Sequence, residues 1–227
     1  MDDGYEIQQE LVKLLIARGD RVIGHKVGAT SAAMQQLIGI DSPDYGPVLE
    51  STMYRHGDSI SLGDFIAPKI EAEIAFVLGD RLVGPGVTYE QARQSIAGMS
   101  ASMEIVDSRI EDWRIKLADT VADLASNGAL VVSDAAVPLD TSEPRAIRMS
   151  LTKNGKVVAA GIGADALGDP ITVLIWLANV LGSNGVALEP GHLILTGALH
   201  AAVPLQAGDT FRAEFDHLGA IEVTVTD

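Results

Sequence analysis

The sequence contains no cysteine. This absence excludes a disulfide framework, a thiolate metal site and a cysteine nucleophile. Basic residues are also few, because 16 lysines and arginines stand against 31 aspartates and glutamates, and the formal net charge is −15. A strongly acidic chain without a run of basic residues is a poor binder of nucleic acid. The acidic excess fits divalent cations as partners, although net charge does not by itself establish a metal site.

Long apolar runs are absent as well. The most apolar stretch, residues 170–182, is shorter than the roughly 20 residues of a membrane-spanning helix, and it contains Asn179. Residues 1–10 are acidic and polar, unlike a secretory signal peptide. The sequence also lacks a nucleophile elbow, a phosphate loop, a dinucleotide fingerprint and a zinc-protease motif. We therefore expect a soluble, cytoplasmic protein with neither membrane nor nucleic acid as a partner.

What the chain does have is a high content of predicted strands. Its 227 residues, 47% of them hydrophobic, suffice for one catalytic domain over residues 1–227. The predicted strands outnumber the helices and do not alternate with them strictly, which favours a mixed α/β, β-rich fold over a doubly wound sheet. Asn154-Gly155 predicts a hairpin turn, and Thr88 with Gln91 predicts a capping box. We expect helices over residues 6–18, 32–37, 89–97, 113–126 and 170–182.

Two glutamates lie one residue apart in the clearest strand, "KIEAEIAF" at residues 69–76. Because side chains alternate along a strand, Glu71 and Glu73 share a face. The pair alone is most simply a solvated strand face. However, its neighbours are apolar, and Glu104 lies in a second apolar strand. Buried carboxylates need basic partners or a cation, and Mg²⁺ or Mn²⁺ prefers such oxygen ligands.

Several segments of the sequence, in order, resemble one enzyme family. They are "GHKVGATSAAMQQLIGIDSPDYGPVLES", "PKIEAEIAFVLG", "MEIVDSRIEDWRIKLADTVAD" and "ILTGAL…PLQAGDTFRAEFDHLGAIEV". They are similar to the 2-keto-4-pentenoate hydratase and 4-oxalocrotonate decarboxylase branch of the fumarylacetoacetate hydrolase superfamily. The resemblance implies a fumarylacetoacetate hydrolase C-terminal-like β-roll with helices packed outside. It also implies a divalent metal, usually Mg²⁺, held by Glu71, Glu73 and Glu104.

The same resemblance gives roles to two residues that would otherwise be unremarkable. Lys26 lies in the glycine-flanked "GHKVGAT", and alone it would be an ordinary surface lysine. Asp44 lies in a loop, where an aspartate normally bonds its own backbone. With the family match, both are candidates for catalytic acid/base chemistry. His25 should point away from Lys26 in an extended segment, so we expect it to be structural, and Tyr45 as well.

Four further residues are candidates for substrate binding. Lys116 stands in a charge-rich segment whose other members form a solvated helix face in the simplest reading. Ser126 lies where related hydratases have a small polar pocket residue. Thr196 and Gly197 resemble the superfamily's "TG" element that lines the pocket, although both are also common at strand ends.

The implied reaction adds water to a 2-hydroxy-2,4-dienoate and yields a 4-hydroxy-2-oxo acid, in catabolism of aromatic compounds or steroids. Three alternatives remain: a 4-oxalocrotonate-type decarboxylase, an acylpyruvate C–C hydrolase, and a non-catalytic partner subunit. A homo-oligomer is expected, with a pathway aldolase or decarboxylase as a candidate partner. The chain departs from the family in three places: a shortened helical region over residues 1–20, Leu124 where relatives often have Asn, and His200 where they tend to have Thr. The last two bear on the shape of the substrate.

Overall fold

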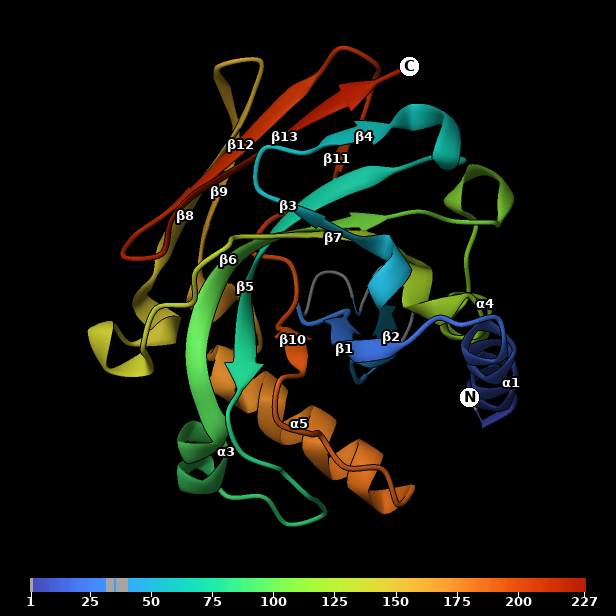
Figure 1. Ribbon diagram of the computed structural model, residues 1–227, viewed down its shortest axis with the longest axis vertical. Helices are drawn as coiled ribbons and strands as arrows, with labels where there is room; N and C mark the ends of the chain where they lie inside the picture. Colours follow the sequence, from blue (N-terminus) through green and yellow to red (C-terminus); the bar gives the residue numbers. More distant parts are fainter. Residues whose placement is uncertain (1, 32–34, 36–40) are drawn as a thin grey trace.

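Two β-sheets form the framework of the protein in a computed structural model, which describes residues 2–31, 35 and 41–227. One sheet has eight strands and the other has five. Figure 1 shows β5 and β6 at the centre of the large sheet, with α5 below them and α1 at the side. This strand-rich mixed α/β architecture confirms the fold class predicted from the sequence.

The large sheet combines antiparallel and parallel neighbours. Its strands in spatial order are β2 (Asp44–Leu49), β1 (Val22–Gly28), β10 (Leu193–Leu195), β5 (Lys69–Leu78), β6 (Ile96–Val106), β7 (Asn127–Val132) and β3 (Met53–Arg55), and β11 (Val203–Pro204) also pairs with β5. The β1–β10 and β3–β7 pairs are parallel, and the others are antiparallel. Strands from distant parts of the chain therefore meet at β5.

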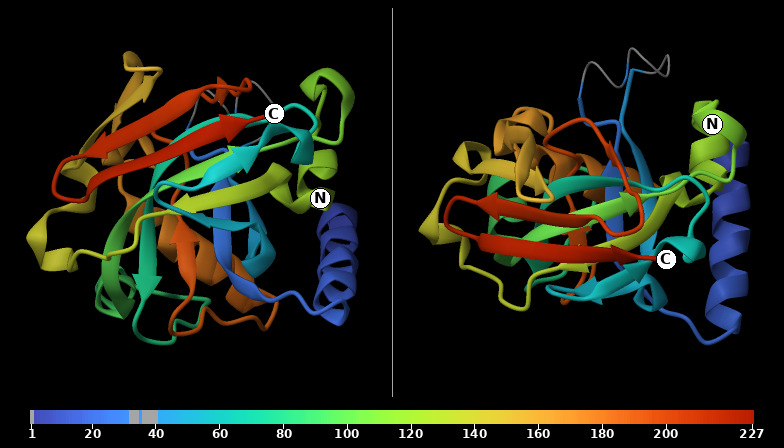
Figure 2. Two further views of the ribbon diagram at one scale, coloured as in Figure 1. Left: turned by 45° about the horizontal axis from the view of Figure 1, so that its top comes forward. Right: turned by 90° about the horizontal axis from the view of Figure 1, so that it is seen from above.

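The small sheet packs against the face of the large sheet that carries Ile74 and Met103, and Figure 2 shows its strands β12 and β13 in red. Its strands in spatial order are β4 (Ser59–Ser61), β13 (Gly219–Thr226), β12 (Thr210–Phe215), β8 (Arg148–Lys153) and β9 (Lys156–Ile162). The β8–β9 hairpin turns at Asn154-Gly155, both with positive φ (53° and 75°), which confirms the predicted turn.

Four described helices flank the sheets: α1 (Asp2–Ala17), α3 (Tyr89–Ser95), α4 (Leu117–Ala122) and α5 (Pro170–Ser183). Thr88 and Gln91 form the predicted capping box of α3. By length and composition the stretch Gly163–Ser183 could cross a membrane. Its α5 part instead buries Ile171, Leu174 and Leu177 completely, as a core helix of a soluble protein does.

One large apolar cluster fills the space between the sheets and continues to α5. Ile74 and Met103 contribute from the large sheet, Phe211 and Val223 from the small sheet, and Leu174 from α5, all fully buried. The shared cluster makes the central strands β5 and β6 a rigid platform, because close-packed interiors resist displacement.

The structure shortens one of the expected helices, and another lies almost entirely outside the described residues. The helix expected over residues 113–126 is wrong in extent, because only Leu117–Ala122 is α-helical. Positive φ values at Asp112 and Trp113 before it, and at Leu124, Ala125 and Ser126 after it, break the helical path. The helix expected over residues 32–37 falls, apart from residue 35, outside the described residues.

Candidate active site

Three glutamates meet on one face of β5 and β6. Glu71 and Glu104 are direct cross-strand partners, and Glu73 follows two residues along β5 on the same face. One carboxylate oxygen from each residue lies within 4.8 Å of the other two. The antiparallel register, which brings residues 71 and 104 opposite each other, therefore creates the cluster.

The cluster suits a hard divalent cation. Glu73 and Glu104 are 1% and 0% exposed. One oxygen of each accepts a hydrogen bond, from the Gly197 N–H (2.8 Å) and from Asn127 Nδ2 (2.8 Å). Their other oxygens, Glu73 Oε1 and Glu104 Oε2, are buried without a hydrogen-bond partner. Buried anionic oxygens without partners are costly, and a cluster of three carboxylates is a donor set that Mg²⁺ or Mn²⁺ accepts.

The electrostatics of the cluster point the same way. Burial raises the pKa of Glu71 to about 7, and the neighbouring Glu104 adds to this shift. Burial also raises the pKa of Glu73 and Glu104, Glu73 further through Glu104 and Glu71. Three like charges in an apolar setting oppose one another, so a bound cation would stabilise the ionised form of all three.

Lys26 supplies a buried positive charge beside the cluster. Its side chain is 5% exposed, and Nζ lies 3.4 Å from Glu104 Oε1 and donates to the carbonyl of Ala125 at 2.9 Å. Burial alone would lower the pKa of Lys26, but Glu104, Asp44 and the other glutamates raise it overall. Lys26 is therefore protonated and supplies a positive charge beside the glutamates.

Asp44 lies beside Lys26, because β1 and β2 pair with Gly28 opposite Asp44. Burial raises the pKa of Asp44, whereas Lys26 lowers it. Its Oδ1 is buried without a hydrogen-bond partner. A Cβ at Gly28 would stand 2.3 Å from this oxygen and 3.0 Å from Lys26 Nζ, so the pair needs glycine at position 28.

The left-handed turn at residues 124–126 completes this side of the site. It directs the Ala125 carbonyl to Lys26, and it buries Ser126, whose hydroxyl lies 3.0 Å from that of Thr120. Leu124 is buried and has φ 56°. The close packing of Gly46 fixes the turn, since a Cβ there would lie 2.2 Å from the Leu124 carbonyl oxygen.

Thr196 and Gly197, which follow β10 directly, support the glutamates. The Thr196 hydroxyl donates to the Ile74 carbonyl at 2.8 Å, and the Gly197 N–H binds Glu73. Gly197 has φ 97°, and a Cβ would lie 2.2 Å from Thr30 Oγ1. Only glycine adopts this conformation without strain, which explains the "TG" pair physically.

Two cavities open from the glutamates and share Gly28, Ala29 and Glu71. We call the first, of about 350 Å³, the lysine chamber; it is lined by Lys26, Asp44, Lys69, Trp113, Thr120 and Ser126, among others. We call the second, of about 500 Å³, the histidine chamber; it is lined by Val27, Glu73, Asp165, Leu199 and His200, among others.

Lys116 is the predicted site residue that the structure does not bring to the others. It is exposed at the start of α4 and lies outside the lining of both chambers. Its role in substrate binding stays a prediction.

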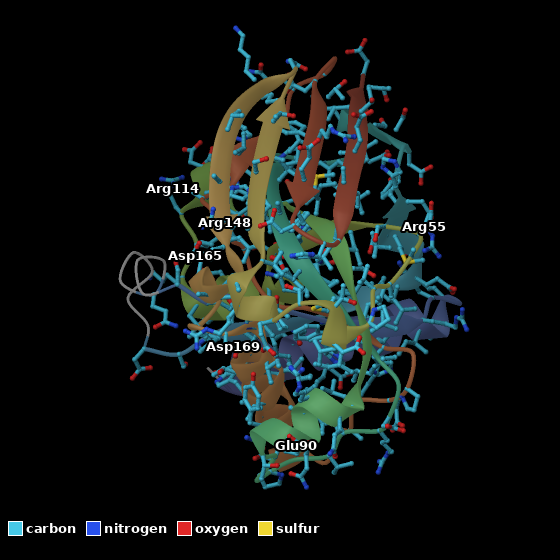
Figure 3. All side chains as sticks on the ribbon, turned by 90° about the vertical axis from the view of Figure 1, so that its left-hand side faces the viewer. Arg55, Glu90, Arg114, Arg148, Asp165 and Asp169 are labelled. Atoms are coloured by element: carbon cyan, nitrogen blue, oxygen red, sulfur yellow. The ribbon has the colours of Figure 1, made fainter. Side chains whose placement is uncertain are left out.

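Sequence reasoning missed several lining residues. Lys69 is half-buried, and its Nζ lies 4.1 Å from the ring centroid of Trp113. Asp165 lines the histidine chamber, and Figure 3 shows it below Arg148, where the small sheet gives way to α5. Asn127 holds Glu104. Lys69 stands next to the E-x-E stretch and could have been noticed, whereas Asp165 carries no local signal.

His25 lies on the other side of β1, as predicted from strand alternation. It lines a separate cavity of about 410 Å³ with Tyr45 and His192. Its ring centroid is 6.0 Å from that of His192. Tyr45 stacks on Tyr5 with ring centroids 4.4 Å apart.

Comparison with known proteins agrees with this geometry. Residues 27–226 match the fumarylacetoacetate (FAA) hydrolase C-terminal family. The chain belongs to this family. It is 38% identical over its full length to a 2-hydroxyhexa-2,4-dienoate hydratase from Comamonas testosteroni and covers 87% of that protein. It is 40% identical over 98% of its length to a 2-keto-4-pentenoate hydratase from Burkholderia vietnamiensis and covers 85% of that protein.

A solved structure gives the same picture of the fold. The 4-oxalocrotonate decarboxylase from Pseudomonas putida G7, complexed with magnesium and adipate, superposes with a TM-score of 0.95. It is 32% identical, and the alignment covers 98% of this chain and 84% of that one. The family and branch predicted from the sequence are thus confirmed, and the neighbour's magnesium is consistent with a divalent metal cofactor.

Proposed function

We propose that this protein is a divalent-metal-dependent hydratase of 2-hydroxy-2,4-dienoates. The observation that carries the proposal is that Lys26 and Asp44 lie beside the three-glutamate cluster and share the lysine chamber with Glu71. The names of the two hydratases at 38% and 40% identity support the same reaction. We also propose that residues 1–227 form one catalytic domain, with α1 as its N-terminal helix.

The glutamate cluster orients the substrate, with the carboxylate end at the glutamates and the diene away from them. Glu71, Glu73 and Glu104 would hold Mg²⁺ or Mn²⁺, which would supply Lewis acidity at the carboxylate end of the substrate. The diene then extends into the lysine chamber, because Lys26 and Asp44 lie there. Val106 and Trp113 give its wall apolar surface beside the carbon chain.

The reaction transfers protons in two stages, and the two catalytic candidates take different parts in it. First, the C2 hydroxyl loses its proton and C5 gains one, which gives the 2-oxo-3-ene. Second, water adds its hydroxyl to C4 and a proton to C3, and the product is a 4-hydroxy-2-oxo acid. Asp44, whose pKa is raised by burial, is the proton carrier. Lys26 stays charged and stabilises the negative charge that develops on oxygen.

The decisive experiment is product analysis with purified protein. With Mg²⁺, 2-hydroxypenta-2,4-dienoate should lose its ultraviolet absorbance and give the 4-hydroxy-2-oxo acid. Treatment with EDTA should abolish turnover, and Mg²⁺ or Mn²⁺ should restore it. Inactivity of the chain alone, with activity only after addition of a paralogue, would instead support a non-catalytic partner subunit.

One observation favours a second candidate, a 4-oxalocrotonate-type decarboxylase. Such an enzyme binds a dicarboxylate and needs a cation at the far end of the cavity. Lys69 lines the lysine chamber and, among the described residues, has no carboxylate within 4 Å. Release of CO₂ from 4-oxalocrotonate without hydration of the pentadienoate would establish this alternative.

The acylpyruvate hydrolase alternative has less support. It needs a histidine that activates water, typically paired with a glutamate. His200 lies near Glu71 and Glu73, but both of its ring nitrogens are engaged with the backbone. We propose a cytoplasmic homo-oligomer, with a pathway aldolase or decarboxylase as its candidate partner. Light scattering of the purified protein, alone and mixed with such an enzyme, tests the assembly.

A further inference from the structure

The edge of β5 next to the glutamates is held in an unusual way. The strand pairs with β10 as far as Leu195 opposite Ala75, and with β11 from Val203 opposite Ile70. Between these two pairings, residues 196–202 leave the strand, which allows the Gly197 N–H to reach the Glu73 carboxylate. The regular backbone ladder along this edge of β5 is therefore interrupted beside the candidate metal ligands.

His200 fills the interruption with its side chain. The Ala72 N–H donates to His200 Nε2 at 2.8 Å, and the Ala72 carbonyl accepts from the Leu199 N–H at 3.1 Å. His200 Nδ1 lies 2.7 Å from the carbonyl oxygen of Ala201. A carbonyl only accepts, so Nδ1 carries the proton, and Nε2 is the unprotonated acceptor that Ala72 requires.

The position of Ala72 gives this bond its consequence. Ala72 is fully buried and lies between Glu71 and Glu73. A buried peptide N–H needs a partner, and here an imidazole takes the place of a strand carbonyl. The peptide that sets the separation of the two carboxylates is thus held by a side chain from another part of the chain.

We propose that His200 is a positioning residue that fixes the β5 backbone between Glu71 and Glu73 and thereby tunes their affinity for a divalent cation. The inference rests on the proposed metal site. It gives His200 no acid/base role, because neither ring nitrogen is free. The proposal also gives a role to His200, which stands where members of the family that the sequence resembles tend to have Thr.

Metal binding by the folded protein without substrate tests the proposal. Titration calorimetry with MnCl₂ should show an affinity about 10-fold weaker in His200→Ala and His200→Leu, the low end of losses for residues that orient metal ligands. His200→Gln, whose side-chain oxygen can accept from Ala72, should stay within about 3-fold of the wild type.

His56 offers a matched control. Its Nδ1 accepts from the Glu222 N–H at 3.0 Å in the small sheet, so it makes the same kind of bond away from the glutamates. His56→Ala should leave the Mn²⁺ affinity unchanged. Equal Mn²⁺ affinities in folded His200→Ala, His200→Leu and wild-type protein would overturn the proposal, as would an equal loss in His56→Ala.

A second measurement needs no variant and covers the case in which the substituted proteins fail to fold. The ¹⁵N–¹H spectrum of the wild-type imidazole should show His200 protonated on Nδ1 and unprotonated on Nε2. A proton on Nε2 overturns the inference whether or not metal binds. Absence of Mn²⁺ binding by the wild type would overturn the proposed metal function instead, while the spectrum still reports on the bond to Ala72.

Discussion

Asp209 and the pair Glu73 and Glu104 are all buried carboxylates, yet their surroundings are opposite. Asp209 lies just before β12 and is 5% exposed. Its Oδ2 accepts from Lys153 Nζ at 2.7 Å and from the Gln206 N–H, and its Oδ1 accepts from Asn154. These partners outweigh the effect of burial and lower the pKa of Asp209.

In the glutamate cluster each buried carboxylate has only one occupied oxygen and faces like charges. Burial alone therefore does not identify a functional carboxylate. Asp209 is neutralised within the fold and holds a turn together. Glu73 and Glu104 need a charge that their protein neighbours do not fully supply, which leaves room for a cation.

The largest expected effect follows from the two catalytic candidates. Lys26→Met and Asp44→Asn should lower turnover by about 10²–10⁴-fold, as is typical when a group that transfers a proton or stabilises developing charge is removed. Steady-state assays with Mg²⁺, together with circular dichroism to confirm folding, make the measurement. Lys153→Met is the matched control, because it removes a partly buried lysine paired with Asp209 and should leave turnover unchanged. A folded Lys26→Met enzyme with near-normal turnover would remove Lys26 from the mechanism.

Removal of one charge from the glutamate cluster should weaken metal binding without making the protein less stable. Glu73→Gln removes one of three like charges and keeps an oxygen for the Gly197 N–H. We expect Mn²⁺ affinity to fall by about 100-fold, whereas the metal-free protein becomes no less stable, because repulsion and burial cost are relieved. Calorimetry and urea unfolding in EDTA measure the two quantities. Loss of stability without loss of Mn²⁺ affinity would make Glu73 a structural group like Asp209.

The sequence predicted this cluster better than its surroundings. Strand alternation and the family resemblance brought together Glu71, Glu73 and Glu104, and they suggested Lys26 and Asp44 as their neighbours. The register that sets residue 71 opposite residue 104 depends on how whole strands align, which local patterns do not encode. The catalytic roles of Lys26 and Asp44 stay predictions.

The turn at residues 124–126 shows why other features were missed. The segment that ends in this turn, "LADTVADLAS" at residues 117–126, has helical apolar spacing. The helix expected to continue to residue 126 ends at Ala122 instead. Tertiary contacts decide the outcome, because the Ala125 carbonyl binds Lys26 and Gly46 packs against Leu124. Likewise, the contact of His200 with Ala72 joins residues 128 positions apart, and no sequence periodicity reports it.

His25 shows that a buried polar atom without a hydrogen-bond partner does not always indicate a metal or substrate site. Its Nδ1 is also buried without a partner, but an imidazole can stay neutral, and burial with His192 nearby lowers its pKa to about 3. The unfolded chain takes up a proton near pH 6.5, so stability is complete above that pH and is lost as the pH falls toward 3.

The variant His25→Gln should escape this loss. Between pH 6.5 and 4.5 the wild type should lose about 1.4 kcal/mol per pH unit relative to the variant. Urea unfolding in EDTA at pH 7.5, 5.5 and 4.5 measures the difference. His217→Gln, an exposed histidine, is the control. Parallel pH profiles for wild type and His25→Gln would show that His25 is not held neutral.

Asp209→Asn should show the reverse of the Glu73 variant. The amide keeps the size of the side chain but weakens the bond to Lys153 and presents a donor where an acceptor is needed. The free energy of unfolding should fall by about 1–3 kcal/mol, the usual cost of an unsatisfied buried polar group. Turnover and Mn²⁺ affinity should not change. A change in either with stability intact would end the distinction between the two kinds of carboxylate.

The smallest expected effect concerns Lys69, and it bears on the choice between hydratase and decarboxylase. Lys69 extends the comparison to cations, since Lys153 is paired with Asp209 whereas Lys69 rests on the Trp113 ring in the lysine chamber. If its ammonium meets a second carboxylate of the substrate, Lys69→Met should lower kcat/KM for 4-oxalocrotonate by about 10-fold, as for one charge-assisted hydrogen bond of roughly 1.5 kcal/mol. The pentadienoate, which has no second carboxylate, should react at an unchanged rate.

Equal losses on both substrates would mean that Lys69 acts on the shared end, by binding the C1 carboxylate or by offsetting the charge of Glu71. In that case the cation at the far end, on which the decarboxylase alternative depends, would be missing from the described lining of the chamber.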